Sequence, residues 1–335
     1  MANYTHPILS YRSFLLYSAY CIQGSTIGVG NLIIFLSIIR YWPLRSRKDC
    51  IVIAGLAFAD FLNMSGYFLA GISRVWYFLL TDRSKIVAFT PKQCVLRSNN
   101  LLFSFSEHLA NLMLCVVSLD RLLCVSFPLQ YIGWSKNLAI SLVLSAYFYT
   151  LCTGAFLVGK VVIADPAGPL STFCFLTSTL RTVHEPFSFS YYQRFSASMA
   201  IFSIVLFLFV GIQYRRGQAK VAGLELASQQ TQNLKQQRRM TITLAMSCLC
   251  TLFFFVLPSQ LGYFFSNLGY RHLATMGWVL SNLNPVFNLI LYPLRHKDIK
   301  MAIKGFLLCK NLPDDVKLWT LALGKAPSSA RDEEK

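Results

Sequence analysis

The sequence predicts an all-α integral membrane protein, with seven transmembrane helices followed by an amphipathic helix. Two observations support this fold class. Of the 335 residues, 55% are hydrophobic and only 13% are charged, whereas soluble domains carry about 25% charged residues. Apolar stretches of about twenty residues, long enough to cross a bilayer, also recur along the chain. They show no alternation between apolar and polar residues, which favours helices over the strands of a barrel.

The expected helices follow one another within a seven-transmembrane domain at residues 14–294, preceded by an extracellular N-terminus at 1–13. The first apolar run begins after a polar segment and has no small-residue cleavage pattern, so we expect a signal anchor rather than a signal peptide. The expected spans are residues 14–39, 50–73, 97–125, 137–163, 195–214, 240–265 and 273–294.

The basic residues between these spans predict an orientation. Sixteen Lys and Arg residues lie near the membrane on the side of the first, third and fifth connections and the C-terminal segment, and ten lie on the other side. The positive-inside rule therefore favours an N-terminus outside a plasma membrane. The net charge of +17 is explained by this topology, because the basic residues do not form one continuous face, and no nucleic-acid partner is expected.

Residues 295–309 are the expected amphipathic helix, and residues 310–335 are the expected cytoplasmic tail. Apolar residues of the helix recur at helical spacing, opposite lysines, as in a helix lying on membrane lipid: Ile299, Ala302, Ile303 and Phe306. Cys309 near its end is a candidate for palmitoylation, with an unmodified cysteine as the alternative. Asn3 begins an Asn-Tyr-Thr sequon and is a candidate for glycosylation.

A charged pair, Asp120 and Arg121, closes the third apolar run and is followed by Pro128 and Tyr131. An arginine with several N–H donors is suited to a reversible ion pair. A pair that merely ends a helix is the alternative interpretation of the dipeptide alone.

Asp60 lies within the second expected helix, where an ionisable side chain is costly. We expect its carboxylate to face the bundle interior and to meet polar partners, for which Asn31, Asn284 and Asn288 are candidates. A purely structural link between helices is the alternative role of this intramembrane polar relay.

The spacing after Asp120 resembles the Asp-Arg-Tyr signature and the following Pro-Leu-x-Tyr of rhodopsin-like G protein-coupled receptors, with Leu122 in place of the signature tyrosine. Gly30-Asn31 and Leu56 to Asp60 resemble two further elements of that family. The resemblance implies a receptor that binds an extracellular small molecule or peptide and activates a heterotrimeric G protein.

The Asn-Pro-x-x-Tyr motif of that family fits the seventh run in two registers. A start at Asn284 keeps Asn-Pro but puts Asn288 where the tyrosine belongs. A start at Asn288 keeps Tyr292 and aligns the basic segment that follows, but loses the proline to Leu289. We prefer the second register. The resemblance then implies a coupling switch formed by Asp120, Arg121, Tyr131, Asn288 and Tyr292.

Other positions depart from the family pattern. Val256 replaces the toggle tryptophan of the sixth helix, and Arg238 and Arg239 stand where many members carry a glutamate that pairs with the switch arginine. Asp120 then remains as the local partner of Arg121. These departures, with a long second outer segment, resemble the nematode serpentine chemoreceptor branch.

The resemblance also implies a disulfide between Cys94, before the third helix, and Cys174, between the fourth and fifth. Cys94 lies two residues further from Arg121 than is usual in the family, which indicates a small insertion or an altered helix start.

A ligand pocket is expected around the middle of the third helix. Glu107 and His108 lie far from either interface, so their burial requires a pocket or an interhelical hydrogen bond. Phe103 stands in place of the amine-binding aspartate and Asn282 in place of the opsin lysine, which disfavours amine and retinal ligands. The pocket candidates are Phe103, Ser104, Glu107, His108 and Asn282.

A channel or transporter is the alternative function. It should show paired broken helices or charged pathways through several spans, whereas only Asp60, Glu107 and His108 stand out within these helices. An enzyme is not expected, because the sequence has neither a His-Glu-x-x-His nor a Gly-x-x-x-x-Gly-Lys-Ser/Thr motif. Neither a metal nor a cofactor is expected.

Overall fold

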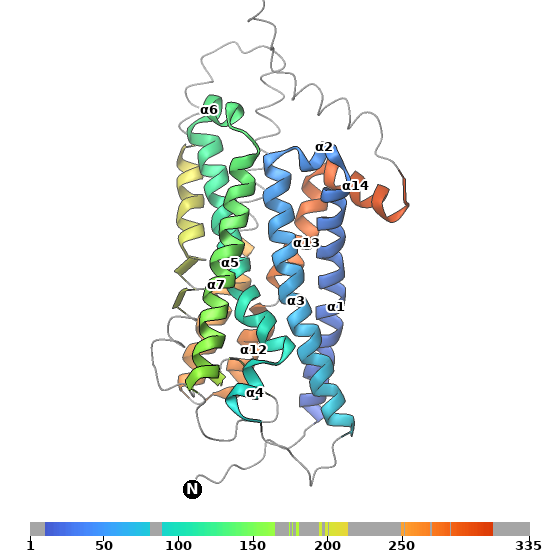
Figure 1. Cartoon of the computed structure of the whole chain (residues 1–335), viewed down its shortest axis with the longest axis vertical. Coiled ribbons are helices and arrows are strands. Elements are labelled where there is room, and N and C mark those ends of the chain that lie inside the picture. Colours follow the sequence, from blue (N-terminus) through green and yellow to red (C-terminus); the bar gives the residue numbers. More distant parts are fainter. Residues whose placement is uncertain are drawn as a thin grey trace, which may run out of the picture.

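The computed structural model describes a bundle of long helices that run along a common axis (Figure 1). Some expected features lie outside the described residues: Asn3, Arg238, Arg239, Asn282 and the tail beyond Lys310. The described ranges are 11–80, 89–164, 201–213, 252–268, 270–281 and 283–310, with shorter pieces at 174, 176, 179–180, 194–195, 198–199 and 249–250.

Within the part of the chain that the structure describes, four helices are long and apolar enough to cross a membrane. The shortest of them has 28 residues, and a helix of that length spans about 42 Å, more than the ~30 Å of hydrocarbon. Large apolar side chains such as Trp76, Phe148 and Ile163 remain exposed on the helices, as lipid-facing residues do. The four helices are α1 (Tyr11–Arg40), α3 (Lys48–Leu80), α5 (Ser98–Ser126) and α7 (Asn137–Ala164).

The second expected helix was predicted to end at residue 73, but α3 continues to Leu80. Arg74 does not end the helix, because its side chain is buried rather than turned to water. Its guanidinium carbon lies 5.3 Å from the centre of the Tyr17 ring on α1.

Short helices flank the long ones: α2 (Trp42–Arg45), α4 (Pro91–Val95) and α6 (Pro128–Gly133). Thr90 caps α4 by a capping box, accepting the Gln93 backbone N–H at 3.2 Å and donating its own to the Gln93 side chain at 3.1 Å. Cys94 therefore belongs to a separate turn, and the third long helix begins only at Ser98. This arrangement accounts for the additional residues between Cys94 and Arg121.

The described C-terminal part is broken at two prolines. Pro258 stands at the start of α11 (Leu257–Asn267), directly after the π-helical turn η1 (Leu252–Val256). The expected seventh span is divided into α12 (Arg271–Ser281) and α13 (Asn284–Arg295), and Pro285 lies in the first turn of α13. Proline is tolerated there because the first N–H groups of a helix have no intrahelical acceptor.

The amphipathic helix is α14 (Lys297–Leu307). Ile299 and Ala302 are buried in the main hydrophobic core, and the Tyr41 hydroxyl at the end of α1 donates to the Lys310 carbonyl at 2.8 Å. The helix is therefore held against α1 at the end of the bundle that also carries α2 and α6 (Figure 1). Cys309, the palmitoylation candidate, is exposed directly after it.

Glycines allow α1 and α3 to approach each other closely. A Cβ atom at Gly24 would lie 2.6 Å from the backbone nitrogen of Phe68, and one at Gly71 would lie 2.7 Å from Cys21 Sγ. Small residues at such contacts permit the van der Waals packing that joins helices in lipid.

We expect Gly24→Ala to lower the stability of the folded protein by about 1–3 kcal/mol, since the added methyl group would meet backbone atoms of α3. Gly28→Ala is the matched control, because its nearest contact would be an ordinary 3.4 Å to the Met64 side chain. The melting temperatures of the two purified variants provide the measurement. Equal melting temperatures for both variants would contradict the close α1–α3 packing.

Candidate functional site

The bundle has two distinct ends, which we name the α6 end and the α4 end. Helices α2, α6 and α14 lie at the α6 end, whereas α4 lies at the other (Figure 1). Polar side chains gather at the α6 end, in the middle of the bundle and at the α4 end.

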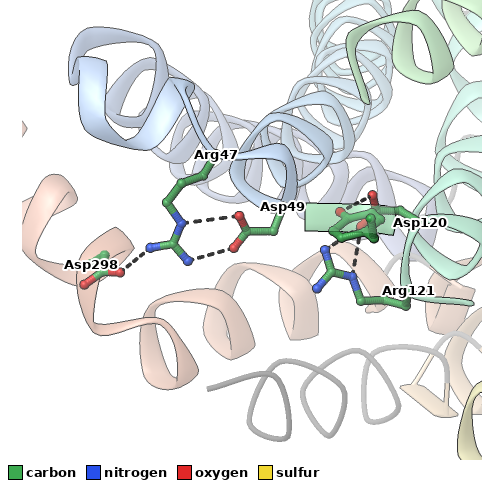
Figure 2. A network of polar contacts seen from close by, with 6 residues as sticks. Arg47, Asp49, Asp120, Arg121 and Asp298 are labelled. Atoms are coloured by element: carbon green, nitrogen blue, oxygen red, sulfur yellow. Dashed lines mark hydrogen bonds and ion pairs between the residues drawn. The ribbon is translucent and has the colours of Figure 1, made fainter. Parts of the chain in front are cut away.

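At the α6 end, the Asp120 carboxylate compensates the charge of Arg121, whose side chain is almost fully buried. Arg121 Nε donates to Asp120 Oδ2 at 3.0 Å, and the terminal guanidinium nitrogen forms an ion pair with the same oxygen (Figure 2). The Tyr131 hydroxyl donates to the second oxygen, Asp120 Oδ1, at 2.7 Å. Both carboxylate oxygens are therefore used.

Tyr131 reaches Asp120 because Phe127 and Pro128 turn the chain from α5 into α6. Burial, together with the nearby Asp120 carboxylate, raises the pKa of the Tyr131 phenol, so it remains protonated and able to donate. The Lys48 ammonium lies 4.3 Å from the centre of the Tyr131 ring and donates to the Tyr131 carbonyl. Lys48 thus links α3 to α6, a contact that the sequence did not reveal.

A second ion-pair group joins the first connection to α14. Arg47 donates to both Asp49 oxygens, at 3.3 and 2.8 Å, and to Asp298 Oδ2 at 2.6 Å. The Asp49 carboxylate raises the pKa of Arg47, which stays charged. The sequence analysis counted Arg47 only among the basic residues near the membrane and gave Asp49 and Asp298 no role.

The two ion-pair groups lie side by side, with Asp49 between Arg47 and the Asp120–Arg121 pair (Figure 2). A small crevice separates them. It is lined by Asp49, Val52, Ile53, Val117, Asp120, Arg121 and His296. A second carboxylate, Asp49, therefore faces the same crevice as the Arg121 guanidinium.

In the middle of the bundle, Asn288 Nδ2 donates to Asp60 Oδ2 at 3.2 Å, and both side chains are buried. Asn31 instead donates to the Ile27 carbonyl of its own helix at 3.1 Å. Asn284 is buried at the start of α13, and Tyr292 is fully buried one turn beyond Asn288. The Asp60 contact supports the register that starts at Asn288.

Serines and a cysteine connect α5 to the fifth helix. The Ser118 and Ser203 hydroxyls lie 2.8 Å apart, and Cys115 Sγ donates to the Met199 carbonyl at 2.8 Å. These contacts escaped the sequence analysis, because isolated small polar residues are common in membrane helices and have no diagnostic spacing.

At the α4 end, Cys94 and Cys174 form the disulfide that the resemblance implied. Asn100 also joins the two chain segments that carry these cysteines. Its amide donates to the Cys94 carbonyl at 2.7 Å and to the Cys174 carbonyl at 3.0 Å. The sequence signal for this role was the position of Asn100, a polar residue in the first turn of the expected third helix.

The pocket candidates on α5 point in different directions. The Phe103 ring lies 4.9 Å from Tyr67 of α3, and the His108 ring lies 5.4 Å from Phe195 of the fifth helix. At about 100° per residue, Glu107 projects between these two faces, toward the bundle interior. The Ser104 hydroxyl donates a hydrogen bond to the Leu101 carbonyl of its own helix at 2.8 Å.

A family model described as serpentine type 7TM GPCR chemoreceptor Srsx matches residues 25–303. This chain belongs to that family. The match spans the residues from α1 to α14 and confirms the expected seven-helix membrane fold and the resemblance to nematode serpentine chemoreceptors. No curated protein matches the chain.

We expect Asn100→Ala to destabilise the Srsx receptor by about 1–3 kcal/mol, because the Cys94 and Cys174 carbonyls each lose a hydrogen bond from its amide. Lys92→Ala, an exposed change in the adjacent α4, is the control. Thermal unfolding of both purified variants under non-reducing conditions checks this expectation. Indistinguishable unfolding curves would contradict a stabilising role for Asn100.

The buried ring of His296 predicts a pH dependence of stability. Burial lowers the pKa of His296 below its ordinary value of 6.5. The unfolded chain therefore binds more protons just below that pH, and stability is lost as the pH falls through about 6.5. We expect the melting temperature to decrease from about pH 7.5 to about pH 5.5 more steeply in the wild type than in His296→Gln. Parallel decreases would contradict this assignment.

Proposed function

We propose that this Srsx-family protein is a chemosensory receptor of the plasma membrane that binds an extracellular small molecule or peptide and activates a heterotrimeric G protein. The observation that carries the proposal is the buried Arg121 at the α6 end, which is paired with Asp120, whose second oxygen accepts the Tyr131 hydroxyl. A guanidinium with one compensating carboxylate is a two-state element, because it can exchange that partner for another acceptor.

The orientation follows from charge and redox chemistry. Helices α2, α6 and α14 belong to the connections and the C-terminal segment that carry the larger number of Lys and Arg residues in the sequence, which favours the cytoplasm for the α6 end. The α4 end carries the Cys94–Cys174 disulfide, a bond that forms in oxidising, extracellular surroundings. A G protein would therefore meet the α6 end, and a ligand would enter from the α4 end.

The described contacts provide a physical route between the two ends. The ligand would act between α3, α5 and the fifth helix, where Glu107 projects into the bundle. The hydrogen bond from Asn288 to Asp60 joins α13 to α3 about midway along the route. Coupling requires that the ligand bind more tightly to the bundle in which Arg121 has left Asp120.

Three variants test the coupling role in nucleotide-exchange assays with reconstituted receptor and several G proteins. Asp120→Asn removes the charge that holds Arg121, and we expect it to raise basal exchange about fivefold or more. Arg121→Ala should abolish exchange, whereas Arg45→Ala, an exposed change at the same end, should leave it intact.

Two results would overturn the proposal. One is an unchanged basal exchange rate in both Asp120→Asn and Arg121→Ala. The other is robust ligand-driven current or transport across the membrane without any nucleotide exchange, which would favour a channel or transporter.

A further inference from the structure

A buried arginine lies near the α4 end, in a position that the receptor switch does not use. Arg74 stands six residues before the end of α3, and its side chain is only 6% exposed. Charged side chains within membrane helices are costly and mark functional sites. Arg74 therefore requires an explanation beyond helix packing.

A series of aromatic rings from three helices begins beside this guanidinium. Arg74 Cζ lies 5.3 Å from the centre of the Tyr17 ring, and Tyr17 lies 6.3 Å from Tyr20 on the same helix. The Tyr20 ring meets Tyr67 of α3 edge to face at 5.4 Å, and Tyr67 meets Phe103 of α5 at 4.9 Å. The series connects Arg74 with a pocket candidate on α5.

The electrostatic surroundings of Arg74 are basic and phenolic. Among the described residues, the groups that act most strongly on its charge are Tyr17, Tyr20, Tyr67 and Arg97. Arg97 itself packs over the Phe89 ring at 4.0 Å. The described cation that acts on Arg74 is therefore a second guanidinium, and the other groups are phenols.

Four of the described carboxylates have other partners in the bundle. Three of them, Asp49, Asp120 and Asp298, belong to the ion pairs of the α6 end. Asp60 accepts the Asn288 amide in the middle of the bundle. A guanidinium also has more N–H donors than one protein acceptor uses, so Arg74 can keep a partner in the protein and still bind a ligand.

We infer that Arg74 and the tyrosines around it bind the carboxylate of a small organic acid that enters from the α4 end. A planar guanidinium pairs with a carboxylate through two parallel hydrogen bonds. The rings of Tyr20, Tyr67 and Phe103 supply apolar surface for the body of such a ligand, as in typical small-molecule sites. The inference rests on the proposed function, and it identifies the ligand of the proposed receptor as a small carboxylic acid.

Binding is tested on the full-length receptor, purified in lipid nanodiscs. Its melting temperature is measured with phenylacetate and octanoate, and with the neutral isosteres phenylacetamide and octanamide. We expect at least one carboxylate to raise the melting temperature by about 2 °C or more, and its amide to have no effect. Arg74→Gln should lose the rise and Arg74→Lys should keep part of it. Arg45→Gln, an exposed change at the α6 end, should keep all of it.

A wild-type experiment covers the case in which Arg74→Gln does not fold. A diazirine derivative of phenylacetate is photolysed on the receptor, and the adducts are mapped by mass spectrometry. The inference predicts labelled peptides that contain Tyr17 to Tyr20 or Tyr67 to Arg74, and competition by phenylacetate but not by phenylacetamide.

The inference is overturned if an amide stabilises as well as its acid, if Arg74→Gln keeps the full rise, or if no carboxylate stabilises and adducts lie elsewhere. Nucleotide exchange driven by a neutral molecule, without carboxylate binding, would overturn the inference but leave the receptor function intact. If the protein binds a carboxylate at Arg74 but never drives nucleotide exchange, the proposed receptor function is overturned and the carboxylate site is retained.

Discussion

The pairing of the Asp120 carboxylate with Arg121 is the interaction on which the α6 end depends. Arg121 is buried, and breaking a buried ion pair by removal of one partner costs about 3–5 kcal/mol. The same carboxylate accepts the Tyr131 hydroxyl, and Lys48 holds Tyr131 from the start of α3. One acidic side chain thus joins α5, α6 and α3. If Asp120 lost its bond to Arg121 or to Tyr131, the packing of all three helices would change.

Elsewhere the bundle is positioned by small residues and a few polar contacts. Burial of apolar surface does not distinguish a neighbouring helix from lipid, so close packing and hydrogen bonds must select the partner. Gly24 permits the contact of α1 with α3, Asn288 ties α13 to Asp60, and Ser118 ties α5 to Ser203. Each contact lies at a different depth, and together they link the two ends of the bundle.

The sequence was sufficient where a signal is local or has a known spacing. Continuous apolarity predicted the long helices, motif spacing indicated Asp120 with Tyr131, Asn288 was one of three candidate partners of Asp60, and the family resemblance implied the disulfide. It was insufficient where partners are distant in the chain: 251 residues separate Arg47 from Asp298, and only folding brings them together. The end of the second helix was placed at residue 73 for a different reason: Arg74 follows that residue, and a charge near the end of an apolar run ordinarily marks the interface.

The most direct test of the central role of Asp120 is a double-mutant cycle between Asp120→Asn and Tyr131→Phe, measured by thermal unfolding of the four purified receptors. If one carboxylate holds both Arg121 and Tyr131, the two changes are coupled, and the interaction energy is about 0.5–3 kcal/mol. Strictly additive effects would contradict the account, because they would mean that Tyr131 and Asp120 act independently.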